Sequence, residues 1–303
     1  MDVDAEAAAY YRALPGALGD RLRQVLQDTE DGTVMTIEDG RCPMWRQDGL
    51  CRIQAELGHD ALCSVCQQFP RLTHDYGDIL DRDLELSCPE AARLIFAEDD
   101  RLSMEDAPGG ETECDPVTLE ILLRSREAVL TFLESKAYPL PQTLTVLLLY
   151  GHALQNELDG GEEAALCPEE LLTEARQYAC TGSMEPLFSF FRNLEILTPQ
   201  WAQMLDAGPL SRHWDNRFYA FARYMVRRYW LQAVSDYDIV CRVKFLVAAC
   251  LLLSALGGDL QETAQRFSKE IENDPDNVEA ILDGAYSAPA LTDTNLLGLL
   301  NEV

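Results

Sequence analysis

From residue 117 onward the sequence is a succession of capped helical segments, and this pattern restricts the fold more than any other feature. Asp115-Pro116 combines an N-cap residue with a first-turn proline, and Gly257-Gly258 stands where a long apolar helix has to end. No run of alternating β-branched residues interrupts this part, which disfavours a parallel sheet. We therefore predict an all-α, mainly helical body over residues 117–303. The expected helices are 117–134, 140–158, 168–180, 198–208, 214–233, 237–256, 260–273 and 277–285.

The N-terminal region is less regular. Two expected helices, 5–14 and 18–27, are separated by Pro15-Gly16. Between residues 28 and 60 three Asp-Gly dipeptides predict turns, with irregular or minor β structure between them. Another helix is expected to begin at Pro89, where a missing N–H costs nothing. We accordingly divide the chain into a Cys-rich helical region (1–97), an acidic linker or loop (98–116) and the helical body (117–303).

The charge balance excludes several classes of partner. The 303 residues include 24 basic and 52 acidic side chains, a formal net charge of −28. Such a field repels nucleic acid and anionic lipid, so we expect no nucleic-acid or membrane partner. The longest apolar run, 245–253, is shorter than the roughly 20 residues that a spanning helix needs. The N-terminus has neither a basic n-region nor an apolar h-region, and we expect a cytoplasmic protein.

Two common nucleotide-binding motifs are absent. None of the 18 glycines lies in a strand, glycine-rich turn and helix of the Rossmann kind. The phosphate-binding loop Gly-X4-Gly-Lys-Ser/Thr is missing as well. These absences disfavour a Rossmann-type methyltransferase or dehydrogenase and exclude P-loop chemistry.

The ten cysteines fall into two groups. Five are scattered, and of these Cys180, Cys241 and Cys250 lie in expected helices, where a free cysteine behaves as a small hydrophobe. Cys241 and Cys250 would be about 13 Å apart on one helix, which is too far for a disulfide. We expect all three to be buried and unbridged. The other five are concentrated between residues 42 and 88 and are Cys42, Cys51, Cys63, Cys66 and Cys88.

This concentrated group predicts a metal site. Thiolates bind soft or borderline metals, and loops rich in turns can bring several of them around one ion or cluster. Cys63 and Cys66 form a CxxC, which fits a redox pair equally well, and buried cysteines without a ligand remain an alternative. The nearby His59 and His74 could also bind metal, although a hydrogen-bonded loop histidine is the simpler interpretation. We expect Cys42, Cys51, Cys66 and Cys88, followed by Cys63, to converge in space.

The same residues carry a resemblance to a known family. The segment has the form Cys-Pro, then Asp-Gly-Leu-Cys-x-Ile, then Cys-x-x-Phe-Pro-Arg, then Ser-Cys-Pro-Glu-Ala-Ala-Arg, and it resembles the signature of flagellin lysine-N-methylases. Cys42, Cys51, Cys66 and Cys88 occupy the cysteine positions of that signature. The match is most specific at 69–71 and 87–93. Its first half is also similar to small bacterial proteins that chelate zinc or iron.

The resemblance implies a protein lysine N-methyltransferase that uses S-adenosylmethionine, acts on a flagellin-like substrate and holds an Fe–S cluster or zinc on its cysteines. Members of both families usually begin with another cluster, CxxxCC, whereas this chain has no cysteine before Cys42. Either the N-terminus is short, in which case a longer chain would complete the metal centre, or part of the site has been lost.

Methyl transfer to lysine also requires a proton acceptor and a pocket that excludes water. The helical body offers several candidates, but aromatic residues in helices most often pack in cores, and we assign no catalytic base. A non-catalytic metal-binding or redox-sensing protein and a helical adaptor with incidental cysteines remain alternative functions. The candidates for accepting the proton or holding the lysine side chain are Asp215, Tyr219, Tyr224, Tyr229 and Trp230.

Overall fold

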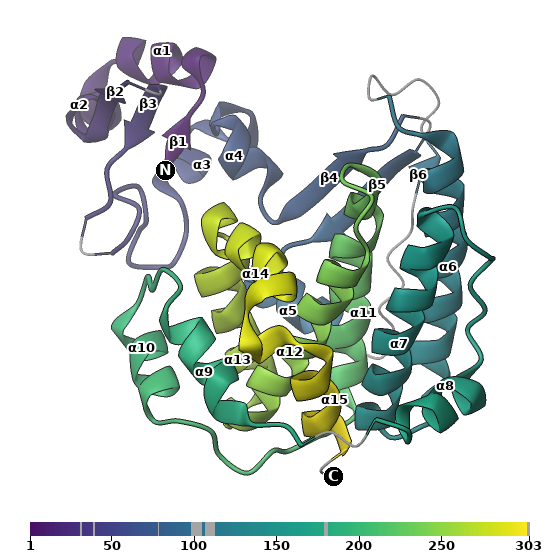
Figure 1. Ribbon diagram of the computed structural model, residues 1–303. Helices are drawn as coiled ribbons and strands as arrows, with labels where there is room; N and C mark the ends of the chain where they lie inside the picture. Colours follow the sequence, from purple (N-terminus) through teal and green to yellow (C-terminus); the bar gives the residue numbers. More distant parts are fainter. Residues whose placement is uncertain are drawn as a thin grey trace. The chain divides into compact units, whose positions relative to one another are not determined.

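The computed structural model in Figure 1 describes residues 1–30, 32–38, 40–77, 79–97, 105–106, 113–178 and 181–301. The chain forms two compact units, Met1–Leu72 and Thr73–Val303. The first unit is shorter than the Cys-rich region placed at 1–97, because helix α5 (Pro89–Ile95) buries its apolar face in the core of the second unit. Most of the acidic linker placed at 98–116 lies outside the described residues.

The first unit combines short helices with a small antiparallel sheet. The strand order is β1-β3-β2, so the minor β structure expected here is present. The helix expected over 18–27 ends at Val25, because the chain continues directly into β2. The elements are β1 (Asp2–Val3), α1 (Ala5–Ala13), α2 (Gly16–Val25), β2 (Leu26–Thr29), β3 (Gly32–Met35), α3 (Arg52–Leu57), the 3-10 helix η1 (His59–Ala61) and α4 (Ser64–Gln68).

One carboxylate connects the two ends of this unit. Asp4 is the N-cap of α1 and accepts a hydrogen bond from the backbone N–H of Ala7 at 2.9 Å. Its other oxygen accepts the N–H of Ser64, at the start of α4, at 2.8 Å. These two hydrogen bonds lower the pKa of Asp4. On the inner side, the Tyr11 hydroxyl donates to the carbonyl of Ala61 at 2.8 Å, so α1 is held against the cysteine-bearing segment.

The second unit begins within a sheet and continues as helices. Its strand order is β4-β5-β6, and this sheet was not expected from the sequence. The predicted mainly helical fold is confirmed. The elements are β4 (Arg71–Asp75), β5 (Ile79–Leu84), α5, β6 (Glu105–Asp106), α6 (Pro116–Ser135), α7 (Leu140–Leu158), α8 (Pro168–Ala175), α9 (Met184–Arg192), α10 (Pro199–Asp206), α11 (Arg217–Tyr229), η2 (Trp230–Val234), α12 (Val240–Leu256), α13 (Leu260–Phe267), the π-helix η3 (Ser268–Glu272), α14 (Pro275–Ser287), η4 (Pro289–Leu291) and α15 (Asp293–Asn301).

The cap signals located several helices closely. Asp115 accepts the backbone N–H of Thr118 at 2.9 Å, which begins α6 at Pro116 as the sequence predicts. Helix α7 has the bounds expected from the sequence. The helix expected over 168–180 ends earlier, at Ala175, where a turn closed by the Gln177 N–H and the Glu174 carbonyl replaces it.

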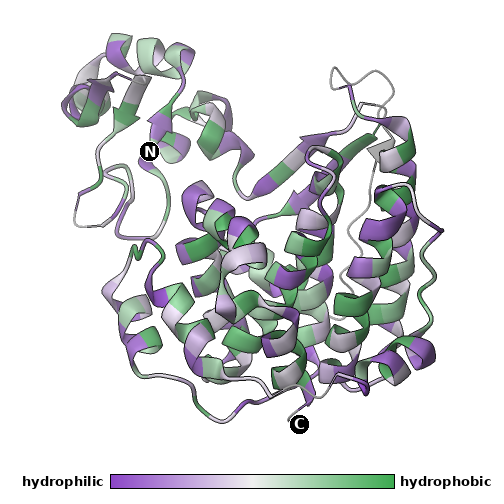
Figure 2. Cartoon of the chain, viewed as in Figure 1, coloured by the Kyte–Doolittle hydropathy of each residue, from purple (hydrophilic) through white to green (hydrophobic). Residues whose placement is uncertain are grey.

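Helix α12 is the centre of the second unit, and all of its residues are buried. Helices α7, α11 and α14 pack against it, and Figure 2 shows hydrophobic residues along these helices. Cys241 and Cys250 are buried and free within it, which confirms the prediction for both. Cys180 lies outside the described residues. Within the described residues, no helix is both long enough and apolar enough to cross a bilayer.

We predict that Gly151→Ala destabilises the protein. A Cβ at Gly151 on α7 would lie 3.0 Å from Cγ2 of Val243, a stiff, buried side chain on α12. Overpacking typically costs about 1–3 kcal/mol, which exceeds the gain in helix propensity of about 1 kcal/mol. Urea unfolding should therefore give a lower free energy of unfolding for the variant. In a Val243→Ala background the same substitution should cost less or stabilise, and a stabilising effect in the wild type would contradict the packing described here.

Candidate functional site

Four of the five concentrated cysteines surround one small core in the first unit. Cys63 is buried there with 2% exposure, and Cys42, Cys51 and Cys66 pack against the same core as partly buried side chains. Cys88 belongs to the second unit, where it is the N-cap residue of α5 and packs against the larger core. The structure thus brings four of the predicted ligands into one core and assigns the fifth to a different unit.

Two methionine sulfurs lie near these thiols, that of Met35 within the core and that of the exposed Met1 outside it. The Cys42 thiol lies 3.8 Å from the Met35 sulfur, and the Cys66 thiol lies 3.9 Å from the Met1 sulfur. Among the residues that the structure describes, however, no three histidine, cysteine, aspartate or glutamate side chains are arranged so that they could hold a metal ion. The thiols share a core without forming a complete ligand set, so the metal site stays a prediction.

Cys63 and Cys66 influence the ionisation of each other. A hydrogen bond from the Cys66 thiol lowers the pKa of Cys63 to about 6, against the opposing effect of burial. The same hydrogen bond and burial raise the pKa of Cys66. Of the two thiols, Cys63 is therefore the one that ionises more readily. A thiolate is the form that binds soft metals and attacks disulfides.

The two histidines near the cysteines are separated. His59 lies in η1 of the first unit and is exposed. His74 lies on β4 within the second unit, where its ring stacks on Tyr76 with centroids 6.3 Å apart. Burial, and then the positive charge of Arg228, lower the pKa of His74. His74 therefore belongs to the charged surroundings of β5.

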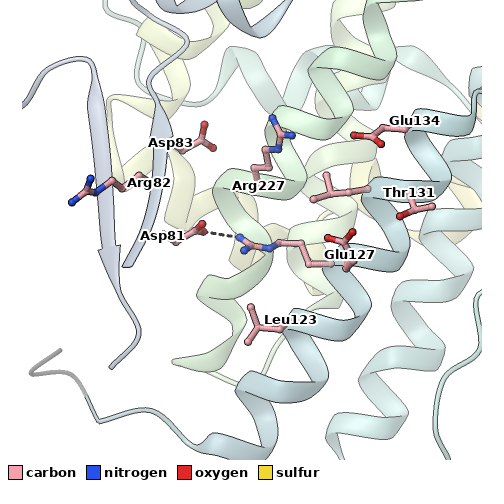
Figure 3. Close-up of a pocket in the computed structure, with 10 residues that line it drawn as sticks. Asp81, Arg82, Asp83, Leu123, Glu127, Thr131, Glu134 and Arg227 are labelled. Atoms are coloured by element: carbon pink, nitrogen blue, oxygen red, sulfur yellow. Dashed lines mark hydrogen bonds and ion pairs between the residues drawn. The ribbon is translucent and has the colours of Figure 1, made fainter. Parts of the chain in front are cut away.

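Strand β5 carries two acids on one face. Alternate residues of a strand point to the same side, so Asp81 and Asp83 face the helices while Arg82 points the other way (Figure 3). Asp81 forms an ion pair with Arg126 of α6 at 2.6 Å, and both side chains are buried. The pair joins the sheet to the helical body.

Asp83 is buried without a complete set of partners. One carboxylate oxygen accepts the N–H of Leu84 at 2.8 Å, whereas the buried Oδ2 has no hydrogen-bond partner. Burial raises the pKa of Asp83 to about 7, although the Leu84 hydrogen bond and the charges of Arg227 and Arg228 act in the opposite direction. A carboxyl group that titrates near neutral pH is typical of functional sites.

A second buried group of charges lies behind Asp83. The Glu272 side chain has no exposed surface and accepts hydrogen bonds from the hydroxyls of Tyr224 at 2.8 Å and Tyr229 at 2.9 Å. Arg228 Nε lies 3.3 Å from the same carboxylate. Burial raises the pKa of both tyrosines, so the hydroxyls keep their protons and act as donors. Glu272 is the last residue of the π-helix η3, a kind of irregularity that recurs at functional sites.

A cavity of about 280 Å³ opens between β5, α6 and α11, as shown in Figure 3. Asp81, Asp83 and Arg126 form its buried wall. The exposed residues Glu127, Thr131 and Glu134 follow one another along one face of α6 at its rim. The remaining lining residues are Arg82, Leu123, Leu130 and Arg227.

Most residues that line this cavity were not predicted from the sequence. Two of the predicted candidates, Tyr219 and Trp230, form hydrogen bonds elsewhere in the second unit. Tyr219 donates to the backbone carbonyl of Tyr138, and Trp230 Nε1 donates to Ser125 Oγ at 2.9 Å. In 79–84 the two acids Asp81 and Asp83 are separated by Arg82, and in a strand this spacing places both acids on one face.

The remaining aromatic and acidic candidates have defined partners as well. Tyr224 and Tyr229 are buried as expected, but they donate to Glu272. Asp215 forms an ion pair with Arg217 at 2.9 Å near the start of α11.

Comparison with known proteins gives a partial match. A stretch of 67 residues is 37% identical to a lysine-N-methylase of Salmonella typhimurium strain LT2, and it covers 22% of this chain and 17% of that protein. A lysine-N-methylase of Salmonella choleraesuis strain SC-B67 matches to the same extent. The flagellar biosynthetic protein FliU of Salmonella muenchen is 38% identical over 65 residues, which cover 22% of this chain and 38% of FliU. No family model and no solved structure matches the chain.

We predict that Asp83→Asn stabilises the protein in a pH-dependent way. The pKa of Asp83 is raised to about 7 in the folded protein. The protonated side chain therefore contributes its full stabilisation below the unfolded-state pKa of about 4, and this stabilisation is lost as the pH rises to about 7. The asparagine of the variant does not ionise, so the variant keeps its stability over this pH range. Its free energy of unfolding should exceed that of the wild type increasingly from pH 4 to pH 7, by roughly 1–4 kcal/mol at the plateau.

Urea unfolding at several pH values measures this difference. Asp283→Asn, at an exposed position of α14, makes the same chemical change and should give a difference close to zero at every pH. A constant difference for Asp83→Asn across this pH range would show that the carboxyl group titrates normally.

Proposed function

We propose that this chain is a protein lysine N-methyltransferase of the flagellin-methylase kind, which transfers a methyl group from S-adenosylmethionine to a lysine ε-amine of a flagellar protein. The observation that carries the proposal is the match, at 37% identity over 67 residues, to a protein named lysine-N-methylase. The similar match to a flagellar biosynthetic protein supports a flagellar substrate. Each match spans less than two thirds of the relative, so the activity of the whole relative is extended to this chain by proposal alone.

The proposed reaction makes specific demands on the protein. S-adenosylmethionine, when bound, supplies an electrophilic methyl group, and the acceptor amine has to be neutral to attack it. Lysine is protonated at neutral pH, so a side chain must take one proton. Burial around Asp83 provides a water-poor environment with a carboxylate oxygen that has no hydrogen-bond partner. The cysteines that the structure describes are all free, which fits a reducing, cytoplasmic compartment.

We further propose that the cysteines of the first unit hold zinc or an Fe–S cluster. The support is chemical: four thiols lie around one core that also contains Met35, and the pKa of one of them, Cys63, is lowered. Cys42, Cys51, Cys63 and Cys66 are the proposed ligands, and Cys88 of the second unit is the fifth candidate. Completing a ligand set requires these thiols to move closer together than they are.

A second candidate function rests on the same pair of thiols. Cys63 and Cys66 combine a thiolate with a neighbouring thiol, which is the arrangement needed to form a disulfide on oxidation. This observation favours a redox-sensing protein without methyltransferase activity, in which oxidation of the pair changes the packing of the first unit.

We predict that protein purified without oxygen contains zinc or iron bound through the first unit. Elemental analysis should find a stoichiometric amount of one metal, and iron in a cluster would also absorb visible light. Cys63→Ala should remove most of it, because its thiolate is the strongest ligand of the set. Cys167→Ala, a partly buried thiol in the second unit, should leave the content unchanged. Metal-free wild-type protein with a Cys63–Cys66 disulfide after exposure to air would support the redox-sensing alternative.

We predict lysine methylation of flagellin by the full chain. When the two proteins are expressed together, mass spectrometry should detect flagellin peptides with added methyl groups on lysine. A flagellin variant whose modified lysines are replaced by arginine should stay unmodified, since an arginine guanidinium does not deprotonate in proteins. Unmodified flagellin in the presence of intact, oxygen-protected enzyme would contradict the proposed activity.

A further inference from the structure

We propose that the cavity between β5, α6 and α11 binds the ammonium group of a lysine side chain and that Asp83 accepts its proton. The inference rests on the proposed function for the identity of the ligand, and on the geometry of the cavity for the location and for the role of Asp83.

The first argument is the unpaired oxygen of Asp83. The side chain lines the cavity, is 6% exposed, and has a buried Oδ2 with no hydrogen-bond partner. A buried acceptor without a donor costs free energy, and a carboxylate is the most costly kind. An ammonium group carries three N–H donors and a positive charge, so it supplies both of the missing interactions.

The second argument is that the other acids near Asp83 have partners, although Nη1 of Arg228 is buried without one. Asp81 is paired with Arg126 at 2.6 Å, and Glu272 is engaged by Arg228 and two tyrosine hydroxyls. These contacts leave Asp83 as the inner-wall acid with an acceptor atom to offer. The charged and titratable groups around it are His74 on β4, Asp81 and Arg82 on β5, Arg126, Glu127 and Glu134 on α6, and Tyr224, Arg227 and Arg228 on α11.

The third argument is the shape and lining of the cavity. Glu127 and Glu134 stand at the exposed rim and attract a cation, and the overall charge of −28 has the same sign. Leu123 and Leu130 offer apolar surface for an alkyl stem. A volume of about 280 Å³ is at the lower end of small-molecule sites, which suits one side chain and not a nucleoside-sized donor.

The proton transfer is balanced. The lysine ammonium gives one proton to Asp83 Oδ2, which leaves a neutral amine and a neutral carboxylic acid. Because burial raises the pKa of Asp83 to about 7, the carboxylate is a better match for an amine than an ordinary aspartate.

Binding of a small probe tests the site without requiring methyl transfer. We expect Nα-acetyl-lysine methylamide to bind the full chain, as followed by NMR, and its uncharged norleucine analogue to bind much more weakly. Asp83→Asn should weaken binding of the lysine probe by roughly tenfold or more, the effect of losing a charged hydrogen bond. Asp283→Asn should bind like the wild type, and circular dichroism of both variants checks that they are folded.

The pH dependence gives a second readout on the wild type alone. Affinity for the lysine probe should rise about tenfold between pH 6 and pH 8, as Asp83 ionises. Equal binding of the norleucine analogue, unchanged binding in Asp83→Asn or a flat pH profile would overturn the site. Probe binding without any flagellin methylation would instead contradict the proposed function and leave the cation site standing.

Discussion

The buried ion pair between Asp81 and Arg126 is the contact on which the second unit's cavity depends. The pair joins strand β5 to helix α6, and its two residues are 45 positions apart in the sequence. Arg126 Nη1 lies 2.6 Å from Asp81 Oδ2, and both side chains are buried. Breaking a buried pair by removing one partner typically costs about 3–5 kcal/mol, because the other charge is left uncompensated. The pair therefore fixes the face of β5 that carries Asp83 at the wall of the cavity.

The acids Asp81 and Glu272 near Asp83 are also buried. Arg228 and Glu272 lie close together, and the tyrosine hydroxyls complete the hydrogen bonding of the glutamate. Among the described carboxylate oxygens that line the cavity, only Oδ2 of Asp83 is buried without a hydrogen-bond partner. Natural proteins satisfy buried polar groups almost everywhere, and exceptions concentrate where function requires them. In the first unit a neighbouring side chain likewise shifts the pKa of a buried group, since the Cys66 thiol lowers the pKa of Cys63.

Local signals in the sequence were sufficient for the helices and insufficient for the cavity. Asp115-Pro116 located the start of α6, and the expected range 140–158 coincides with α7, because helix starts and ends are encoded by near neighbours. The sheet of β4 and β5 went unpredicted, since its strands are short and polar. Contacts such as Asp81 to Arg126 or Tyr224 to Glu272 join distant segments and leave no local pattern. Clustering in sequence grouped five cysteines, of which four lie around one core, whereas Cys88 belongs to another unit.

The most direct test of the cavity as a cation site is an NMR titration of the Asp83 carboxyl carbon in aspartate-labelled protein, with the signal identified by its absence in Asp83→Asn. Burial without a partner should place the midpoint near pH 7, and added n-butylammonium should move it to lower pH, because a bound cation favours the ionised carboxylate. A midpoint close to the usual aspartate pKa of about 4, unaffected by the ammonium ion, would contradict both the burial of the charge and its role as a proton acceptor.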